Sequence, residues 1–323
     1  MRGRIKEKHK DVPGDALLLK SNGHPTYHLA NVVDDHLMEI SHVMRAQEWI
    51  PSAPLHVLMY RAFGWESPIY VHLPLVTGKD GQKLSKRHGS TSVIEFRTKG
   101  YLPEALLNYI SLLGWSYDDS REFFSRQDLE RLFDIHKLNK APAVFDYKKL
   151  EWFNGNYIRE LGDNELYAGV LPFVTTAGIV SAPPTESEER TLRSALPLIR
   201  ERLKLLSDAP DLVRFLFAHV TDYAAEDLIP KKSDAGFART VLQADRKVLE
   251  DLAAGHIDDE DEAIEAAFRQ VSEHLDTKMG NVMLPLRIAI TGSRVSPPLI
   301  GSIRAIGIPE AISRVDYAMG KLG

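Results

Sequence analysis

Three cationic side chains lie within five residues of one short, glycine-flanked segment. Residues 81–89 read Gly-Gln-Lys-Leu-Ser-Lys-Arg-His-Gly. The ammonium groups of Lys83 and Lys86 can bind phosphate oxygens as point charges, and the Ser85 hydroxyl and backbone N–H groups can add hydrogen bonds. A solvated basic loop is the ordinary meaning of an isolated basic pentapeptide. The segment is therefore a candidate polyphosphate-binding loop whose interpretation depends on the elements around it.

Short strands and one helix precede this loop. Residues 26–33, 40–45 and 69–76 are apolar and β-branched enough to predict strands, and the last of them ends in a Gly-Lys-Asp-Gly turn at 78–81. A helix is expected to begin at 52–54, with proline in its first turn, and to end before Gly64. Strand, helix and strand in this order are typical of a parallel α/β sheet.

From about Val93 onward the apolar periodicity is helical. Helices are expected from Pro103 to Gly114 and from Ser125, and residues 181–189 form a linker in which Thr185 can cap the next helix. Two stripes with helical spacing and short helices opened by prolines at 297–298 and 309 follow. The first stripe, which we expect to be kinked at Pro197, consists of Leu192, Leu196, Ile199, Leu203 and Leu206. The second follows an acidic run at 258–262 and consists of Ile264, Phe268, Val271 and Leu275.

Composition excludes several classes of protein. The 323 residues carry a formal net charge of −5, with 44% hydrophobic and 26% charged types, as in a soluble globular protein. There is no cysteine, which excludes disulfides and thiolate zinc sites, and no apolar run approaches the length of a membrane span. We expect His28 and His36 to be hydrogen-bonded structural residues, so no metal site is predicted. An acidic net charge does not exclude a nucleic-acid partner, because local clusters of basic groups decide phosphate binding.

The order Lys-Leu-Ser-Lys-Arg resembles the Lys-Met-Ser-Lys-Ser signature of class I aminoacyl-tRNA synthetases. It is most similar to the Lys-(Leu/Ile)-Ser-Lys-Arg form of the glutamyl-tRNA synthetases. Further segments resemble the same enzymes in the same order, from about residue 12 to the end of the chain. They are residues 20–36, 45–50, 101–109, 145–158 and 285–293.

The resemblance implies a fold and its divisions. We expect an α/β class, with a partial Rossmann-type nucleotide-binding domain followed by an all-α stem-contact and anticodon-binding region. The expected boundaries are 1–92 for the second half of the catalytic domain, 93–160 for the stem-contact region and 161–323 for the anticodon-binding domain.

The resemblance also implies an activity and its substrates. Glutamyl-tRNA synthetases use ATP, with Mg²⁺, to activate L-glutamate as glutamyl-adenylate and transfer it to tRNA-Glu. Tyr27, Asn31 and Arg45 match the family positions that hold the amino acid, and an arginine can bind a carboxylate with two parallel hydrogen bonds. For Tyr27 alone, a core aromatic would be the preferred interpretation. The matching catalytic positions are Lys83, Ser85 and Lys86, and the matching ATP positions are Glu48, Trp49, Leu75, Val76, Lys83, Leu84, Lys86 and Arg87.

Arginines of the helix around 190–206 match those with which the family reads the anticodon. At helical spacing, Arg200 lies on one flank of the leucine stripe and Arg202 on the other. A solvated helix face is the usual meaning of such charges. The resemblance makes Arg202 the first candidate for the third anticodon base and Arg200 the second.

The chain departs from the family in one respect. It contains no His-x-Gly-His sequence, and the first half of the nucleotide-binding domain has no match. We therefore expect a C-terminal portion of the enzyme, inactive alone and monomeric when full-length. Its incomplete parallel sheet is expected to leave an open edge and apolar surface exposed. The alternative is a catalytically silent tRNA-binding module. Glutaminyl enzymes, expected to end in β-barrels, are disfavoured by the helical pattern after residue 185. The expected compartment is the cytoplasm, with the mitochondrial matrix as alternative.

Overall fold

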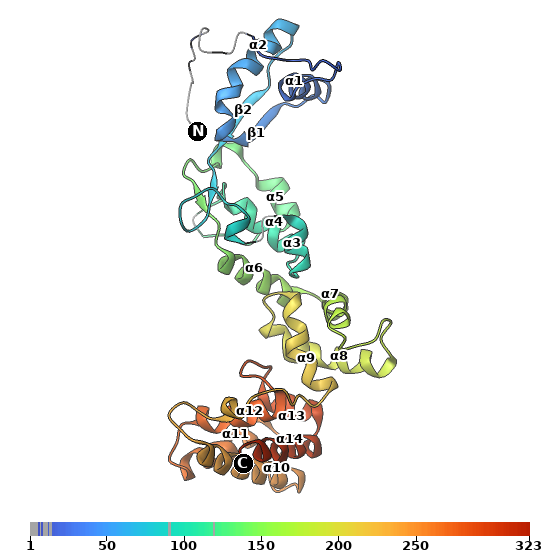
Figure 1. Ribbon diagram of the computed structural model, residues 1–323, viewed down its shortest axis with the longest axis vertical. Coiled ribbons are helices and arrows are strands. Elements are labelled where there is room, and N and C mark those ends of the chain that lie inside the picture. Colours follow the sequence, from blue (N-terminus) through green and yellow to red (C-terminus); the bar gives the residue numbers. More distant parts are fainter. Residues whose placement is uncertain (1–5, 7, 9–11, 13–14, 90–91, 119) are drawn as a thin grey trace. The chain divides into compact units, whose positions relative to one another are not determined.

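The computed structural model describes residues 6, 8, 12, 15–89, 92–118 and 120–323, which form two compact units (Figure 1). Unit 1 comprises residues 1–95 and 103–150, and unit 2 comprises residues 96–102 and 151–323.

Unit 1 begins with a helix and a parallel strand–helix–strand arrangement. After α1 (Tyr27–Leu37), β1 (His42–Ala46) is followed by a 3-10 turn, by α2 (Ala53–Phe63) and by β2 (Ile69–Leu73). The two strands are parallel, with Arg45 opposite His72. Pro54 lies in the first turn of α2, and Gly64 ends the helix in the left-handed conformation at φ 72°. The predicted strand–helix–strand order from residue 40 onward is confirmed.

The predicted strand at 26–33 is wrong, because this segment begins α1. Val32 is fully buried and packs in a small core with Met59 and Tyr60 of α2, so burial along one helical face outweighs the β-branched composition. Across the same interface, His28 Nδ1 lies 2.9 Å from His56 Nε2. Both the core and this histidine pair hold α1 against α2.

The predicted strand at 69–76 is divided at Pro74. β2 ends at Leu73, and β3 (Val76–Thr77) pairs in parallel with β4 (Ala143–Val144). Proline has no N–H to give to a ladder, so the chain leaves one two-stranded sheet and joins another. The predicted turn at 78–81 follows directly.

The remainder of unit 1 is helical. Its elements surround a core built on Trp115, Phe124 and Leu138. Ser125 forms a capping box with Asp128, as the predicted helix start requires. The elements are η3 (Lys86–His88), α4 (Pro103–Leu112), α5 (Arg126–Leu132) and η4 (Ile135–Lys137), with α3 (Val93–Thr98) and α6 (Tyr147–Glu160) running on into unit 2.

Unit 2 consists of helices, 3-10 turns and loops in its described residues, which confirms the expected helical character of the C-terminal part. The expected all-α character from residue 93 onward is wrong at Ala143–Val144, because these residues form the short strand β4 beside β3. Two apolar cores lie within unit 2, one around α7, α8 and α9 and one around α10, α11, α12 and α14. Its longer helices are α7 (Asp163–Thr176), α8 (Glu186–Ile199), α9 (Ala209–Phe217), α10 (Ala235–Ala253), α11 (Asp261–His274), α12 (Met279–Thr291), α13 (Leu299–Ile306) and α14 (Ile308–Lys321).

The first leucine stripe is buried as predicted, but not in one helix. Thr185 caps α8 in a capping box with Glu188, and α8 ends at Ile199. The next residues form the 3-10 turns η5 (Arg200–Arg202) and η6 (Leu206–Asp208), so the helical phase used to place the two arginines fails beyond Ile199. The C-terminal helix is also longer than expected, because α14 has 14 residues.

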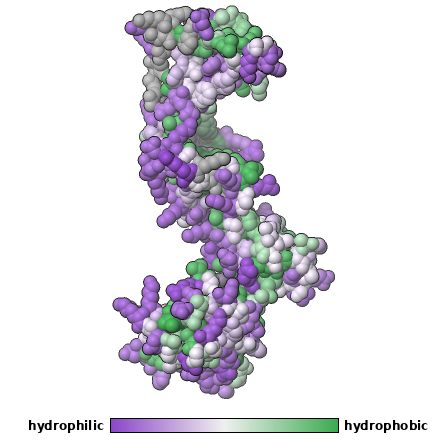
Figure 2. Space-filling view, viewed as in Figure 1, coloured by the Kyte–Doolittle hydropathy of each residue, from purple (hydrophilic) through white to green (hydrophobic). Residues whose placement is uncertain are grey.

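Several apolar side chains of unit 1 are exposed. Met44 and Ile69, on β1 and β2, are 42% and 58% exposed, and Leu37 and Phe63 are exposed at the ends of α1 and α2. Figure 2 shows apolar, green side chains at the surface of this α1–α2 region.

Among the described residues, no helix has the length and apolarity that crossing a membrane requires.

One buried side chain joins three segments of unit 2. Asn154 Oδ1 accepts the Leu102 N–H at 2.7 Å, and its Nδ2 donates to the carbonyls of Gly100 at 3.4 Å and Lys204 at 2.6 Å. A Cβ on Gly100 (φ 81°) would lie 2.7 Å from the backbone nitrogens of Leu206 and Ser207, so glycine is required for this approach.

We predict that Asn154→Ala lowers the free energy of unfolding of unit 2 by about 2 kcal/mol, because it leaves buried backbone groups unpaired. Asn156→Ala is the matched control, since Asn156 lies half-buried on the same helix and its amide bonds within that helix, to the Trp152 carbonyl and from Arg159. Chemical denaturation followed by circular dichroism measures both. Equal losses in the two variants would contradict the prediction.

A second prediction concerns the histidine pair of unit 1. Burial, helped by Arg45 and His28, lowers the pKa of His56 to about 4. Between that value and about 6.5, the unfolded chain binds a proton that the folded chain does not. Stability contributed by unit 1 should therefore fall as the pH is lowered through this window. Histidine ring NMR would show the His56 midpoint, and a midpoint near 6.5 would contradict it.

Candidate active site

The basic loop doubles back on the strand that precedes it. The Gly78 N–H donates to the Gln82 carbonyl at 2.8 Å, and the Leu84 N–H donates to the Val76 carbonyl at 3.0 Å. Gly81 takes φ 74°, which lets the chain reverse. These bonds fix the start of the Lys-Leu-Ser-Lys-Arg sequence beside the end of β3.

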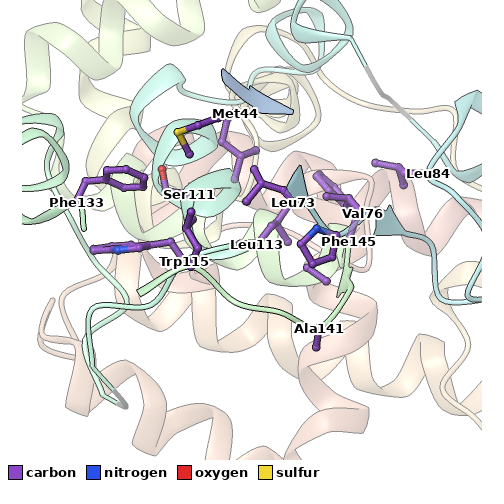
Figure 3. Close-up of a pocket in the computed structure, with 15 residues that line it drawn as sticks. Met44, Leu73, Val76, Leu84, Ser111, Leu113, Trp115, Phe133, Ala141 and Phe145 are labelled. Atoms are coloured by element: carbon purple, nitrogen blue, oxygen red, sulfur yellow. The ribbon is translucent and has the colours of Figure 1, made fainter. Parts of the chain in front are cut away.

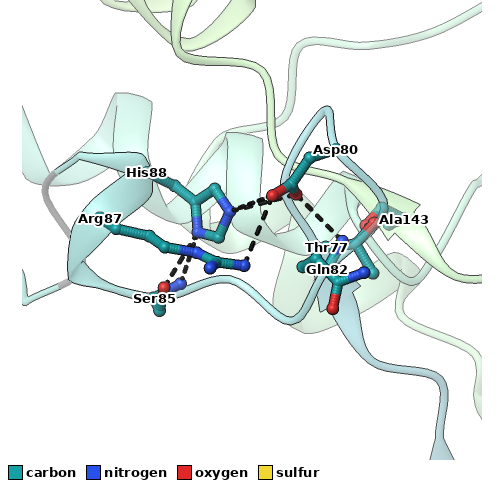
Figure 4. Close-up of polar contacts among 7 residues, drawn as sticks. All are labelled: Thr77, Asp80, Gln82, Ser85, Arg87, His88 and Ala143. Atoms are coloured by element: carbon teal, nitrogen blue, oxygen red, sulfur yellow. Dashed lines mark hydrogen bonds and ion pairs between the residues drawn. The ribbon is translucent and has the colours of Figure 1, made fainter.

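A histidine and an aspartate brace the loop from within (Figure 4). His88 Nδ1 accepts the Ser85 N–H at 3.0 Å and lies 3.1 Å from Ser85 Oγ, while its Nε2 lies 3.1 Å from both Asp80 oxygens. The accepting Nδ1 places the neutral ring's proton on Nε2, which then donates to Asp80. A Cβ on Gly78 would lie 2.6 Å from the His88 ring, so the ring can take this position only because residue 78 has no side chain.

Sequence reasoning did not identify Asp80 or His88 as parts of this site. The Gln82 N–H donates to Asp80 Oδ1 at 3.0 Å, and this bond, followed by His88, lowers the pKa of the Asp80 carboxyl. An aspartate one residue before a glycine in a turn is the available signal for such a bond. Arg87 reaches the same carboxylate at 3.5 Å.

Two of the predicted ATP residues are ion-paired with each other. Lys83 Nζ lies 2.8 Å from Glu48 Oε2 and 3.1 Å from Oε1. Both side chains are solvent-accessible, at 61% and 43% exposure, so separating them costs at most about 1 kcal/mol. Lys83 can therefore exchange this carboxylate for a phosphate. The side chain of Lys86 lies outside the described part of the structure.

The three predicted amino-acid residues come from α1 and β1. Tyr27 and Asn31 lie one helical turn apart at the start of α1. The Tyr27 ring lies 4.9 Å from the ring of Trp49, and Arg45 Cζ lies 5.8 Å from the same ring. Trp49 follows Glu48 in the turn after β1, so it joins the predicted amino-acid residues to the Glu48–Lys83 pair.

The Arg45 guanidinium has two buried nitrogens with nothing bonded to them. Nη1 and Nη2 have no hydrogen-bond partner among the described residues, and no carboxylate of that part lies within 4 Å. Burial and Arg45 lower the pKa of His72, and burial raises the pKa of Asp35 despite its attraction to Arg45. A buried guanidinium with free Nη groups is an arrangement that can bind a carboxylate with two hydrogen bonds.

Two more of the predicted ATP residues lie at an apolar cavity of about 420 Å³ in unit 1 (Figure 3). Val76 and Leu84 line it, whereas Leu75, which precedes Val76, does not. Met44 and Trp115 are among its other walls. Its walls carry few polar groups, so it can accept a flat apolar surface. Among the described residues, no group of three or more acidic or histidine side chains is placed to hold a metal ion.

The two predicted anticodon residues differ in their surroundings. Arg200 is held inside unit 2, where it donates to the carbonyls of Arg159 and Leu161 and pairs with Asp163 at 2.6 Å. Arg202 is exposed, and the structure gives it no hydrogen-bond or ion-pair partner among the described residues. Burial, and then the charge of Arg202, lower the pKa of Arg287. The free cation is therefore Arg202.

Family models match both halves of the chain. The catalytic domain of the class I tRNA synthetases (E and Q) matches residues 1–152, and an anticodon binding domain matches residues 165–319. The chain is 50% identical to the glutamate–tRNA ligase of Treponema denticola over 99% of its length, and 48% identical to that of Borreliella burgdorferi over 98%. It spans 66% and 64% of those relatives, which is less than two thirds of each.

Solved structures agree with these sequence matches. A crystal structure of a glutamate tRNA ligase from Elizabethkingia meningosepticum in complex with its amino acid is similar, with a TM-score of 0.71 and 30% identity. The match covers 95% of this chain and 62% of that one. The partial Rossmann-like region, the helical region and the two family models together show that this chain belongs to the glutamate and glutamine group of class I tRNA synthetases, with glutamate–tRNA ligases as its relatives.

Proposed function

We propose that this chain is the part of a glutamate–tRNA ligase that holds the basic loop and the anticodon-binding region. ATP and L-glutamate form glutamyl-adenylate and pyrophosphate, and the glutamyl group then passes to the terminal ribose of tRNA-Glu. The observation that carries this proposal is Arg45, whose Nη groups are buried and have no partner among the described residues. Its guanidinium lies 5.8 Å from the Trp49 ring, and Glu48, the residue before Trp49, pairs with the loop lysine Lys83.

Glutamate recognition rests on Arg45, Tyr27 and Asn31. A carboxylate of glutamate accepts the two free N–H groups of Arg45, which relieves the cost of their burial. The Tyr27 hydroxyl and the Asn31 amide orient the rest of the amino acid. Glutamine would place an amide NH₂ against the same donors, so the site favours the acid over the amide.

The loop supplies positive charge for the triphosphate. Lys83, Lys86 and Arg87 bind phosphate oxygens, and Ser85, held by His88, adds a hydroxyl. Glu48 and Trp49 lie at the adenosine, with Val76 and Leu84 at the apolar cavity and Leu75 beside them. Mg²⁺ enters with ATP and shares the charge of its phosphates.

The chemical step needs charge stabilisation more than covalent assistance from the protein. A glutamate carboxylate oxygen attacks the α-phosphorus, the bond from that phosphorus to the bridging oxygen breaks, and pyrophosphate leaves with the electron pair. Negative charge grows on the leaving phosphates, where Lys83 and Lys86 act. No proton transfer is required in this step, which agrees with a loop rich in cations.

The helical regions hold the tRNA in this proposal. Residues 93–160 contact the acceptor stem and residues 161–323 bind the anticodon, following a catalytic part that ends at residue 92. Arg202 reads the third anticodon base, because it is exposed and unpaired where Arg200 is bound internally. The cytoplasm is the proposed compartment and the full-length enzyme is proposed to be a monomer.

The first prediction from this proposal concerns Lys83. In an intact enzyme that includes this chain, Lys83→Ala should slow tRNA-dependent ATP–pyrophosphate exchange with glutamate about 100-fold, while glutamate affinity changes less than about twofold, because Lys83 acts on the leaving phosphates. Lys79→Ala is the matched control, since Lys79 lies in the same loop but pairs with Asp146 at 3.1 Å.

The unchanged 323-residue chain is measured alongside. Because this chain contains no His-x-Gly-His sequence, we expect it to bind tRNA-Glu without catalysing exchange. Exchange by the 323-residue chain would overturn this account of the active site. Equal loss of exchange and of glutamate binding in Lys83→Ala would contradict the role given to Lys83.

The second prediction concerns the anticodon. Arg202→Ala should weaken binding of tRNA-Glu by about tenfold or more and remove discrimination at the third anticodon base, as loss of a two-hydrogen-bond base contact does. Filter binding of tRNA-Glu and of a transcript changed at that base measures both quantities. A uniform loss for the two transcripts would indicate a phosphate contact and overturn the assignment.

A further inference from the structure

Strand β2 places two ring side chains next to Arg45. Tyr70 and His72 are two residues apart, so they share one face of the strand, and His72 is the register partner of Arg45. Their rings are nearly parallel, with an interplanar angle of 9° and centroids 6.2 Å apart. The two rings therefore form one continuous wall beside the guanidinium.

Both rings contact Arg45, each at a different part of the guanidinium. Arg45 Nε donates to His72 Nε2 in a long hydrogen bond of 3.4 Å. Arg45 Cζ lies 5.3 Å from the centroid of the Tyr70 ring and 5.8 Å from that of Trp49. The hydrogen bond from Nε and the two aromatic contacts hold the guanidinium in place without using either Nη atom.

His72 can accept from Arg45 only while its ring is neutral. Burial, followed by the nearby charge of Arg45, lowers the pKa of His72, which keeps the ring uncharged near neutral pH. Because Nε2 accepts, the neutral ring carries its proton on Nδ1. The positive charge of Arg45 thus helps to keep the His72 ring neutral, which is the form that can accept the hydrogen bond from Arg45.

We propose that His72 and Tyr70 are positioning residues for the amino-acid site, which orient the Arg45 guanidinium so that Nη1 and Nη2 point to the substrate carboxylate. This inference rests on the proposed function for the identity of that carboxylate. Its structural part, that β2 immobilises the guanidinium in advance of the ligand, stands on the contacts alone.

The physical reason is preorganisation. An arginine side chain has several rotatable bonds, and ordering it at the moment of binding would reduce the affinity. A guanidinium that is already fixed at Nε and along one face has Nη1 and Nη2 in position to donate two parallel hydrogen bonds to a carboxylate. Neither ring needs to touch glutamate for this effect.

Calorimetry of glutamate binding to the full chain gives the first test. His72→Leu and Tyr70→Leu should each weaken binding about tenfold, as the loss of one hydrogen bond or one partly buried cation–π contact does. His72→Gln, which retains an acceptor, and Tyr70→Phe, which retains the ring, should stay within about threefold of the unchanged chain. His42→Leu is the control for removing a histidine, since His42 lies exposed on β1.

Guanidinium NMR gives a test that needs no ligand. In ¹⁵N-arginine-labelled chain, the Nε–H signal of Arg45, assigned by its loss in Arg45→Lys, should be protected from exchange. Protection should persist in Tyr70→Phe, His72→Gln and His42→Leu, and fall in the two leucine variants. Circular dichroism melting establishes that each variant is folded.

The outcomes separate the inference from the proposed function. If the unchanged chain binds no glutamate while the Arg45 signal behaves as described, the assignment of glutamate fails and the positioning role stands. If glutamate binds with unchanged affinity to folded His72→Leu and Tyr70→Leu, or if the Arg45 signal is equally protected in all variants, the positioning role is overturned.

Discussion

The candidate active site depends on one buried cation that nothing in the described chain neutralises by direct contact. Arg45 keeps both Nη groups free and buried, a cost that only a carboxylate or similar anion relieves. The surrounding side chains fit this single charge. Burial and the charge of Arg45 lower the pKa of His56 and of His72, which favours uncharged rings, and Asp35 makes no ion pair with Arg45 in the described part of the chain. In the proposed function, the carboxylate of the substrate supplies the opposite charge.

The basic loop holds several cationic side chains close together, and neighbouring carboxylates offset their repulsion. Glu48 pairs with Lys83, and Asp80 pairs with Arg87 and accepts a hydrogen bond from the neutral His88 ring. Each of these pairs is at least partly exposed, so solvent screening makes it weak and easily exchanged. The backbone bonds around Gly78 and Gly81 hold the shape of the loop, which leaves the side chains free to change partners.

Much of the fold could be predicted from local signals. Gly64, Ser125 and Thr185 marked helix ends and starts that the structure confirms, because capping needs only neighbouring residues. The helix at 27–37 could not be read locally, since its β-branched residues are helical only through packing against α2. The end of α8 at Ile199 was missed for a similar reason: the buried stripe continues, but through 3-10 turns. Within the site, family motifs located Arg45 and Lys83, whereas Tyr70, His72 and His88 act through contacts across strands or turns that no spacing in the sequence reveals.

The break at Pro74 has a mechanical consequence for the loop. The chain before the break belongs to the sheet of β1, and the chain after it belongs to the pair that β3 makes with β4. The Phe145 N–H donates to the Thr77 carbonyl at 2.8 Å, and Lys79 pairs with Asp146. The base of the loop is therefore carried by residues 143–146 rather than by the strand that holds His72. A displacement of residues 143–146 would therefore move the proposed phosphate-binding loop relative to Arg45, and Pro74 lies between the two sheets.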